Sequence, residues 1–379
     1  LCATTSEPLA VSTLRGELAD NGEWKVDPAR PAIVIGTVDM IGSRLLFSGY
    51  GDGRYGRAHH AGLLGQDALI VHDESHLSPA FTAVLRSVEN EQRREHDRAL
   101  AAGFPTRPVR VLDLSATARD RHGGGIRLAL TGEDELDPIV RARLDAAKWL
   151  RLHSVETGAD ARLPGLLADL ALQHDGDAVK VLVYVRNPQT ALQVAGTITR
   201  RLGKGSDERV ALLTGTIRGH ERDLLVSTHP VYQAFLDPER SVLQTVYLVS
   251  TSAGEVGIDI DADHMVCDLT TLDALIQRLG RVNRRGGAGR TAYVDLVLAR
   301  SGKDSAGSPV AAAVDATAEI LESWQTGSGR PILVGPRALS ALVNSTDPDL
   351  RRRAFSPEPG IPPLTDILLD NWSLTSVRK

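Results

Sequence analysis

The chain has 379 residues, 42% hydrophobic and 24% charged, which is typical of a globular protein and argues against a disordered or low-complexity chain. Its two cysteines, Cys2 and Cys267, argue against a disulfide framework or a structural zinc site and favour a cytoplasmic protein, and no apolar run approaches the ~20 residues of a membrane span. The net charge of −5 and the aromatic content of 4% would by themselves disfavour a nucleic-acid partner.

Short apolar, β-branched runs predict strands, and amphipathic segments between them predict helices. The predicted strands are 32–35, 68–71, 109–114, 179–185, 210–213, 245–249 and 292–298. These runs are continuous rather than alternating, which indicates parallel strands covered on both faces. After the fourth run, Asn187 is expected to cap a helix that Pro188 begins. The pattern therefore predicts an α/β fold.

A glycine- and acid-rich stretch over 120–138 separates two sets of predicted strands. We expect one α/β domain over residues 1–150 and a second over 151–300. Residues 301–379 are expected to form a linker and a mainly helical segment.

The first chemical motif is an apolar strand that ends in Asp73 and Glu74, with His76 two residues later. In a P-loop nucleotidase, a first carboxylate at a strand's carboxyl end would hold Mg²⁺ on the nucleotide, and a second would polarise the attacking water. His76 would relay the nucleotide state. Taken alone, the pair also fits solvated acids at a strand end.

The second motif consists of small hydroxyl residues, Ser115 and Thr117, after the predicted strand 109–114. If that strand neighbours the first one, these hydroxyls lie beside the carboxylates. An ordinary strand-to-loop turn is the alternative interpretation.

The third motif places Gln277, Arg281 and Arg284 at positions i, i+4 and i+7, which predicts that all three project from one face of a helix. Guanidinium groups bind phosphate oxygens bidentately and stay charged, so this array suits a polyphosphate. A solvated basic helix face is the alternative.

The fourth motif is a glycine-punctuated loop after the strand 245–249, in which Thr251 could contact a strand phosphate. Gly257 would permit close backbone approach, and Asp259 could contact the nucleotide or pair with an arginine. By itself this segment also fits an ordinary loop.

Together, the four motifs resemble motifs II, III, VI and V of the superfamily 2 helicases of the DExH type. The segment Gln277–Gly286, with Asn283 inside it, is similar to the CRISPR-associated type I helicase–nuclease. Residues 36–47, followed by 60–67, resemble the type I-G branch of that family. The resemblance covers residues 32–300 and implies two RecA-like parallel-sheet domains in tandem.

The resemblance implies an ATP- and Mg²⁺-dependent 3′-to-5′ DNA translocase that unwinds target DNA after an RNA-guided surveillance complex has opened it. Asp73 would be the metal ligand, and Glu74, His76, Gln277, Arg281 and Arg284 the catalytic residues, with Gly257 and Asp259 on the nucleotide and Ser115 and Thr117 in coupling. Single-stranded or duplex DNA would be held by its backbone. The candidate contacts are Thr37, Arg44, Arg186, Thr214, Arg218 and Thr251.

The sequence departs from the family in one respect, because it contains no Gly-x-x-x-x-Gly-Lys-Ser/Thr. Of its six lysines, only Lys204 and Lys303 follow a glycine, and neither precedes Ser or Thr. We expect motif I to belong upstream of residue 1, so that the first domain is N-terminally truncated and inactive alone. Two alternatives are another DExH helicase, acting on RNA or in DNA repair, and an ATP-independent nucleic-acid-binding module.

Overall fold

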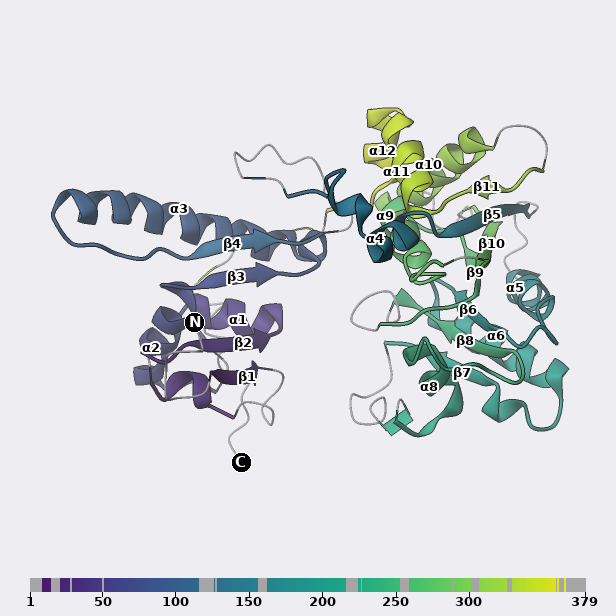
Figure 1. Cartoon of the computed structure of the whole chain (residues 1–379), viewed down its shortest axis with the longest axis horizontal. Helices are drawn as coiled ribbons and strands as arrows, with labels where there is room; N and C mark the ends of the chain where they lie inside the picture. Colours follow the sequence, from purple (N-terminus) through teal and green to yellow (C-terminus); the bar gives the residue numbers. More distant parts are fainter. Residues whose placement is uncertain are drawn as a thin grey trace. The chain divides into compact units, whose positions relative to one another are not determined.

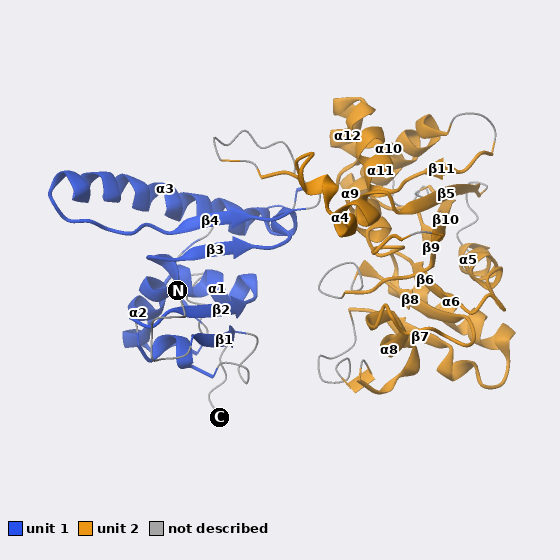
Figure 2. Ribbon diagram, in the orientation of Figure 1, with its two compact units in different colours: residues 1–122, 358–379 blue, residues 123–357 orange. Residues whose placement is uncertain are grey.

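The computed structural model describes residues 9–14, 21–27, 29–49, 51–115, 126, 128–155, 162–215, 224–225, 227–252, 259–287, 289–300, 307–325, 329–358, 360 and 365. It divides into two compact units (Figure 2), unit 1 with Leu1–His122 and Glu358–Lys379, and unit 2 with Gly123–Pro357. No helix among the described residues is both long and apolar enough to span a bilayer.

Unit 1 is built from short parallel strands and the helices between them (Figure 1). Its strands are β1 (Ala10–Leu14), β2 (Ala32–Gly36), β3 (Leu69–His72) and β4 (Arg110–Asp113). Its helices are α1 (Val38–Leu45), α2 (Arg54–Gly65) and α3 (Pro79–Ala101), with short 3-10 turns at Glu23–Lys25 and Ser75–Leu77. β1 pairs with β2, and β3 pairs with β4.

Only one face of the unit 1 strands is covered among the described residues. Val34 and Ile70 point into the core with Leu14, Phe81 and Leu85, whereas their strand neighbours lie on the other face. The side chains exposed there are Val11, Ile33, Ile35, Leu69 and Val71. The expectation of coverage on both faces is therefore not met in unit 1.

Unit 2 holds a seven-stranded sheet in the order β11-β5-β10-β9-β6-β8-β7 (Figure 1). Its strands are β5 (Ala147–Ser154), β6 (Lys180–Tyr184), β7 (Val210–Leu213), β8 (Val246–Ser250), β9 (His264–Asp268), β10 (Thr291–Leu298) and β11 (Ile332–Leu333). All neighbours are parallel except β11, which is antiparallel to β5.

Helices cover both faces of this sheet, as the continuous apolar runs predicted. Val181 and Val183 pack against α5 (Leu163–Leu172) and α6 (Pro188–Leu202), and the alternate residues Leu182 and Tyr184 lie in the opposite core. The remaining helices are α4 (Pro138–Leu144), α8 (Pro230–Leu236), α9 (Leu272–Leu279), α10 (Pro309–Trp324), α11 (Pro336–Ser345) and α12 (Pro348–Ala354), with 3-10 turns at Asp134–Leu136 and Ser206–Glu208. Asn187 caps α6 by accepting a hydrogen bond from Gln189 N at 2.8 Å.

The units divide near residue 122, earlier than the expected boundary at 150. The reason is β5, which lies between β10 and β11 and so belongs to the second sheet. The segment after residue 300 is helical as expected, but it is no separate body through Pro357, because Val314, Leu321 and Ala354 are buried in the core of unit 2.

Candidate functional site

The carboxylates of the first motif follow the end of β3 in a tight turn. Asp73 is exposed, and its Oδ1 accepts a hydrogen bond from Glu74 N at 3.0 Å. Glu74 has φ 50° and ψ 43°, a left-handed conformation that costs about 1–3 kcal/mol for a residue with a side chain.

His76 and Ser115 meet beside these carboxylates. Ser115 Oγ and His76 Nδ1 lie 3.0 Å apart in a hydrogen bond, and His76 Nδ1 is 3.5 Å from Glu74 Oε2. Ser75 N donates to Leu114 O at 3.0 Å, which joins the ends of β3 and β4. Unit 1 thus places Asp73, Glu74, His76 and Ser115 at one edge, and Thr117 lies outside the described residues.

His72 and Asp113 lie directly behind this edge, and the sequence reasoning did not single them out. His72 Nδ1 is 3.5 Å from Asp113 Oδ1, and Asp113 also binds Arg86. Burial lowers the pKa of His72, while the nearby Asp113 acts in the opposite direction. A histidine that ends an apolar run is the signal that could have identified this pair.

The unit 1 candidates for nucleic-acid contact differ in exposure. Thr37 is exposed and caps α1 by accepting a hydrogen bond from Met40 N at 3.4 Å. Arg44 is only 4% exposed, donates to Met40 O at 2.9 Å, and its Nε lies 3.5 Å from Asp52 Oδ2. The guanidinium of Arg44 is thus engaged inside unit 1, which disfavours a contact with a nucleic-acid strand, and that contact stays a prediction.

The third motif does not lie along a single helical face. Helix α9 ends at Leu279, so Gln277 is helical, whereas Arg281 and Arg284 belong to the turn that follows. Asn283 has φ 41°, and Val282 bridges Ala262, which pulls the chain away from the helix axis. The expected i, i+4, i+7 face is wrong for this reason. We call residues 280–287, of which all are described, the arginine turn.

The fourth motif meets the arginine turn through Arg284. Arg284 Nη1 lies 2.6 Å from Asp259 Oδ1, and Arg284 N donates to Asp261 Oδ1 at 2.8 Å. Of the two expectations for Asp259, the arginine pair is the one present. Gly257 lies outside the described residues.

The remaining candidates lie at the carboxyl ends of the unit 2 strands. Thr251 N donates to Leu213 O at 3.1 Å, so Thr251 and Thr214 follow neighbouring strands, and both are buried. Arg186, one-third exposed, follows β6, and its backbone N donates to Asp268 Oδ2 at 2.9 Å. Arg218 lies outside the described residues.

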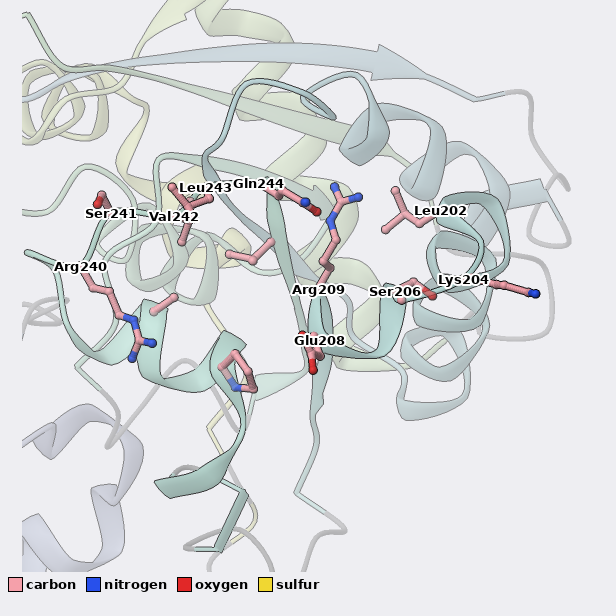
Figure 3. Close-up of a pocket in the computed structure, with 14 residues that line it drawn as sticks. Leu202, Lys204, Ser206, Glu208, Arg209, Arg240, Ser241, Val242, Leu243 and Gln244 are labelled. Carbon is pink, nitrogen blue, oxygen red and sulfur yellow. The ribbon is translucent and has the colours of Figure 1, made fainter.

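A cavity of about 580 Å³ lies at the opposite ends of β7 and β8 (Figure 3). Its basic side chains are engaged elsewhere, since Arg209 Nε donates to Thr245 O at 3.0 Å and Arg240 Nη1 donates to Gln233 Oε1 at 2.8 Å. Lys204 extends away from the other two. This cavity is therefore separate from the motif residues at the carboxyl ends.

The residues present fit a nucleotide-bound Mg²⁺ rather than a metal held by protein alone. No group of three or more His, Cys, Asp or Glu in the described part of the chain could hold a metal ion. Mg²⁺ in nucleotide sites takes most ligands from phosphate and water and one or two from carboxylates. The exposed Asp73 would supply one such carboxylate, and Glu74 Oε2 beside it is buried without a hydrogen bond from the described residues, 3.5 Å from His76 Nδ1.

Comparison with known proteins bears on the fold and the family. Residues 177–287 match the family described as CRISPR-associated nuclease/helicase Cas3, C-terminal. A curated relative, the ATP-dependent RNA helicase dbp3 of Aspergillus clavatus, is 28% identical over 204 residues, which are 52% of this chain and 36% of the relative.

Solved structures with the same fold cover nearly the whole chain. The T. fusca Cas3-ATP crystal structure has a TM-score of 0.59 and 17% identity, over 97% of this chain and 44% of that chain. A CRISPR RNA-guided surveillance complex in its pre-nicking state has a TM-score of 0.54 and 15% identity, over 91% and 45%. The chain spans less than half the length of these structures. Residues 177–287 thus match the C-terminal Cas3 family model, and the chain has the fold seen in the T. fusca Cas3 structure.

Proposed function

We propose that this chain is the motor part of an ATP-dependent DNA helicase or translocase of a type I CRISPR interference system, which unwinds target DNA for degradation. The observation that carries the proposal is the 3.0 Å contact between His76 and Ser115. This hydrogen bond connects the carboxylates after β3 to the end of β4. A motor needs such a connection, because hydrolysis of a bound nucleotide must change the position of neighbouring segments.

The motifs imply nucleotide roles for residues of each unit by itself. Asp73 is suited to hold Mg²⁺, Glu74 to orient and polarise water, and His76 to report the state of the site. When bound, Mg²⁺ would neutralise charge on the phosphate oxygens. In unit 2, Gln277, Arg281 and Arg284 would contact the phosphates, while Gly257 would allow close backbone approach to the nucleotide and Asp259 would contact the nucleotide or orient Arg284.

Nucleic acid would be held through its backbone. Thr37 in unit 1 and Arg186, Thr214 and Thr251 in unit 2 lie after strand ends. Arg218, outside the described residues, stays a candidate by its place in the sequence. Hydroxyls, amides and arginines bind phosphates without reading bases, which suits a translocase. Arg44, engaged inside unit 1, stays a prediction from the sequence.

The names of similar structures support DNA, nucleotide and complex partners. They include T. fusca Cas3 with AMPPNP, the DUF1998 helicase MrfA bound to DNA and AMPPNP, and the surveillance complex. The relative named as an RNA helicase favours a second candidate, a DExH helicase acting on RNA.

A third candidate, of another class, is an ATP-independent nucleic-acid-binding module. A strand-displacement assay separates the three candidates. A form of the protein extended with a P-loop segment should displace a DNA strand from a duplex with a 3′ overhang, in the presence of ATP. Displacement of RNA alone would support the second candidate, and ATP-independent strand binding without displacement would support the third.

A further inference from the structure

A buried lysine fixes the residue just before the arginine turn. Lys148, on β5, is 3% exposed, and its Nζ donates to Leu279 O at 2.7 Å. Leu279 is the last residue of α9, where carbonyl groups lack an intrahelical donor and the helix dipole favours a cation. Lys148 therefore stabilises the point at which α9 ends and the turn begins.

Asn283 fixes the middle of the turn. It is fully buried, and its Nδ2 donates to Ala147 O at 3.1 Å and to Arg290 O at 3.2 Å. Its backbone N donates to Ala262 O at 2.8 Å, in a left-handed conformation that asparagine tolerates better than most residues. Gly286 closes the turn where a Cβ would collide with Ala142 O.

Asp261 fixes the far side of the turn. Its Oδ1 accepts from Arg284 N at 2.8 Å, and its Oδ2 accepts from Arg290 Nη1 at 2.7 Å. Arg290 Nη2 also donates to Asp263 Oδ1 at 2.8 Å. Asp261 is 2% exposed, so this carboxylate is satisfied entirely by the turn and by Arg290.

A buried lysine and a buried aspartate are costly for folding, and well-packed apolar side chains would serve stability as well. The charged groups that face Lys148 are Asp261, Arg284 and Arg290, and burial lowers the pKa of Lys148 to about 8. A role other than stability accounts for keeping these charges, since they meet at the two ends of one short turn.

We propose that Lys148 and Asp261 are positioning residues, which hold the arginine turn so that Arg281 and Arg284 project together toward a bound triphosphate. This inference rests on the proposed function for its ligand, but the rigidity of the turn is measurable without it. Neither residue itself contacts nucleotide.

Hydrogen exchange measured by mass spectrometry tests the rigidity. Lys148→Met and Asp261→Asn should each raise exchange at residues 280–287 at least tenfold, while β6 stays protected. The matched control is Tyr232→Phe, because Tyr232, on α8, is also buried and its hydroxyl donates to a backbone carbonyl, Leu212 O, at 2.6 Å. It should loosen α8 and leave the arginine turn unchanged.

Unchanged exchange in the turn of a folded variant, or equal loosening in all three variants, would overturn the proposal. Lys148→Met and Asp261→Asn act at different ends of the turn. If one variant fails to fold, the other still tests the proposal. Equilibrium dialysis of ATP with a form extended by a P-loop segment adds the ligand. Lys148→Met should lower the ATP affinity of that form as much as Arg281→Ala does, and Tyr232→Phe should not. If Arg281→Ala leaves ATP binding unchanged, the arginine turn does not bind the nucleotide. The hydrogen-exchange result still tests whether Lys148 and Asp261 hold the turn in place.

Discussion

The guanidinium of Arg278 lies 3.1 Å from the carboxylate of Asp268, and both side chains are almost fully buried in unit 2. Arg278 also donates to Asp268 O at 3.3 Å, and its Cζ lies 5.2 Å from the centre of the Tyr184 ring. The pair joins α9 to the ends of β9 and β6. Arg278, the arginine next to Gln277 in the motif, is therefore structural.

Replacing Arg278 with methionine should destabilise unit 2 strongly. The apolar side chain fills similar space but leaves Asp268 charged and buried, which lowers the free energy of unfolding by about 3–5 kcal/mol. Urea denaturation, monitored by circular dichroism, measures this free energy of unfolding. Arg281→Met, at a partly exposed site, should change stability by less than ~1 kcal/mol. Equal losses of stability in Arg278→Met and Arg281→Met would contradict a buried ion pair at Arg278.

Arg44→Met should destabilise unit 1 without weakening strand binding. Arg44 Nε lies 3.5 Å from Asp52, whose carboxylate is also 2.8 Å from His60 Nδ1, so the variant removes one buried partner. We expect a loss of about 2–4 kcal/mol. Fluorescence anisotropy of single-stranded DNA with the folded variant provides the second measurement. A loss of affinity with no loss of stability would restore Arg44 to the nucleic-acid site.

The buried amine of Lys148 should make stability depend on pH. Burial lowers its pKa to about 8, below the ordinary value of ~10.4. The amine therefore binds its proton more tightly in the unfolded chain than in the folded one. The buried ammonium lowers the free energy of unfolding by its full amount below pH 8, and this loss disappears as pH rises toward ~10.4. Between pH 8 and pH 10 the wild type should gain roughly 2 kcal/mol relative to Lys148→Met. A constant difference across this range would contradict the buried charge.

Salt dependence reports the phosphate contacts of unit 2. Arg186→Ala should reduce the slope of log affinity for single-stranded DNA against log salt by about 0.7. Arg285→Ala is the matched control, because Arg285 pairs with Glu239 in unit 2 and lies outside the proposed strand contacts. If the two variants show the same slope, Arg186 does not bind a phosphate.

The sheet of unit 2 could be predicted where strands are apolar throughout, as in 179–185 and 245–249. β5 and β9 were missed because their polar residues have partners far along the chain. Arg151 and His153 of β5 both bind Asp295 of β10, each at 2.6 Å. Such side chains interrupt an apolar run, and nothing local shows that they are neutralised.

The residue types of the site could be predicted, but their placement could not. The spacing of Gln277, Arg281 and Arg284 fits a helix, and the helix ends early because Lys148 and Ala262 bind the chain just beyond Gln277. Arg44 has the side chain of a phosphate ligand, yet it is buried, with its guanidinium next to Asp52 and Met40 O. In each case a contact between separate segments decides the outcome.

ATP hydrolysis tests the central claim most directly. The chain as printed should hydrolyse ATP no faster than its Asp73→Asn variant, with or without single-stranded DNA, because it has no P-loop. A form extended with a P-loop segment should show DNA-stimulated hydrolysis that falls at least 100-fold, on the order of one lost catalytic group, in Glu74→Gln and Arg284→Ala but not in Arg285→Ala. DNA-stimulated hydrolysis by the printed chain, or its absence from an extended form that folds and binds ATP, would contradict the account.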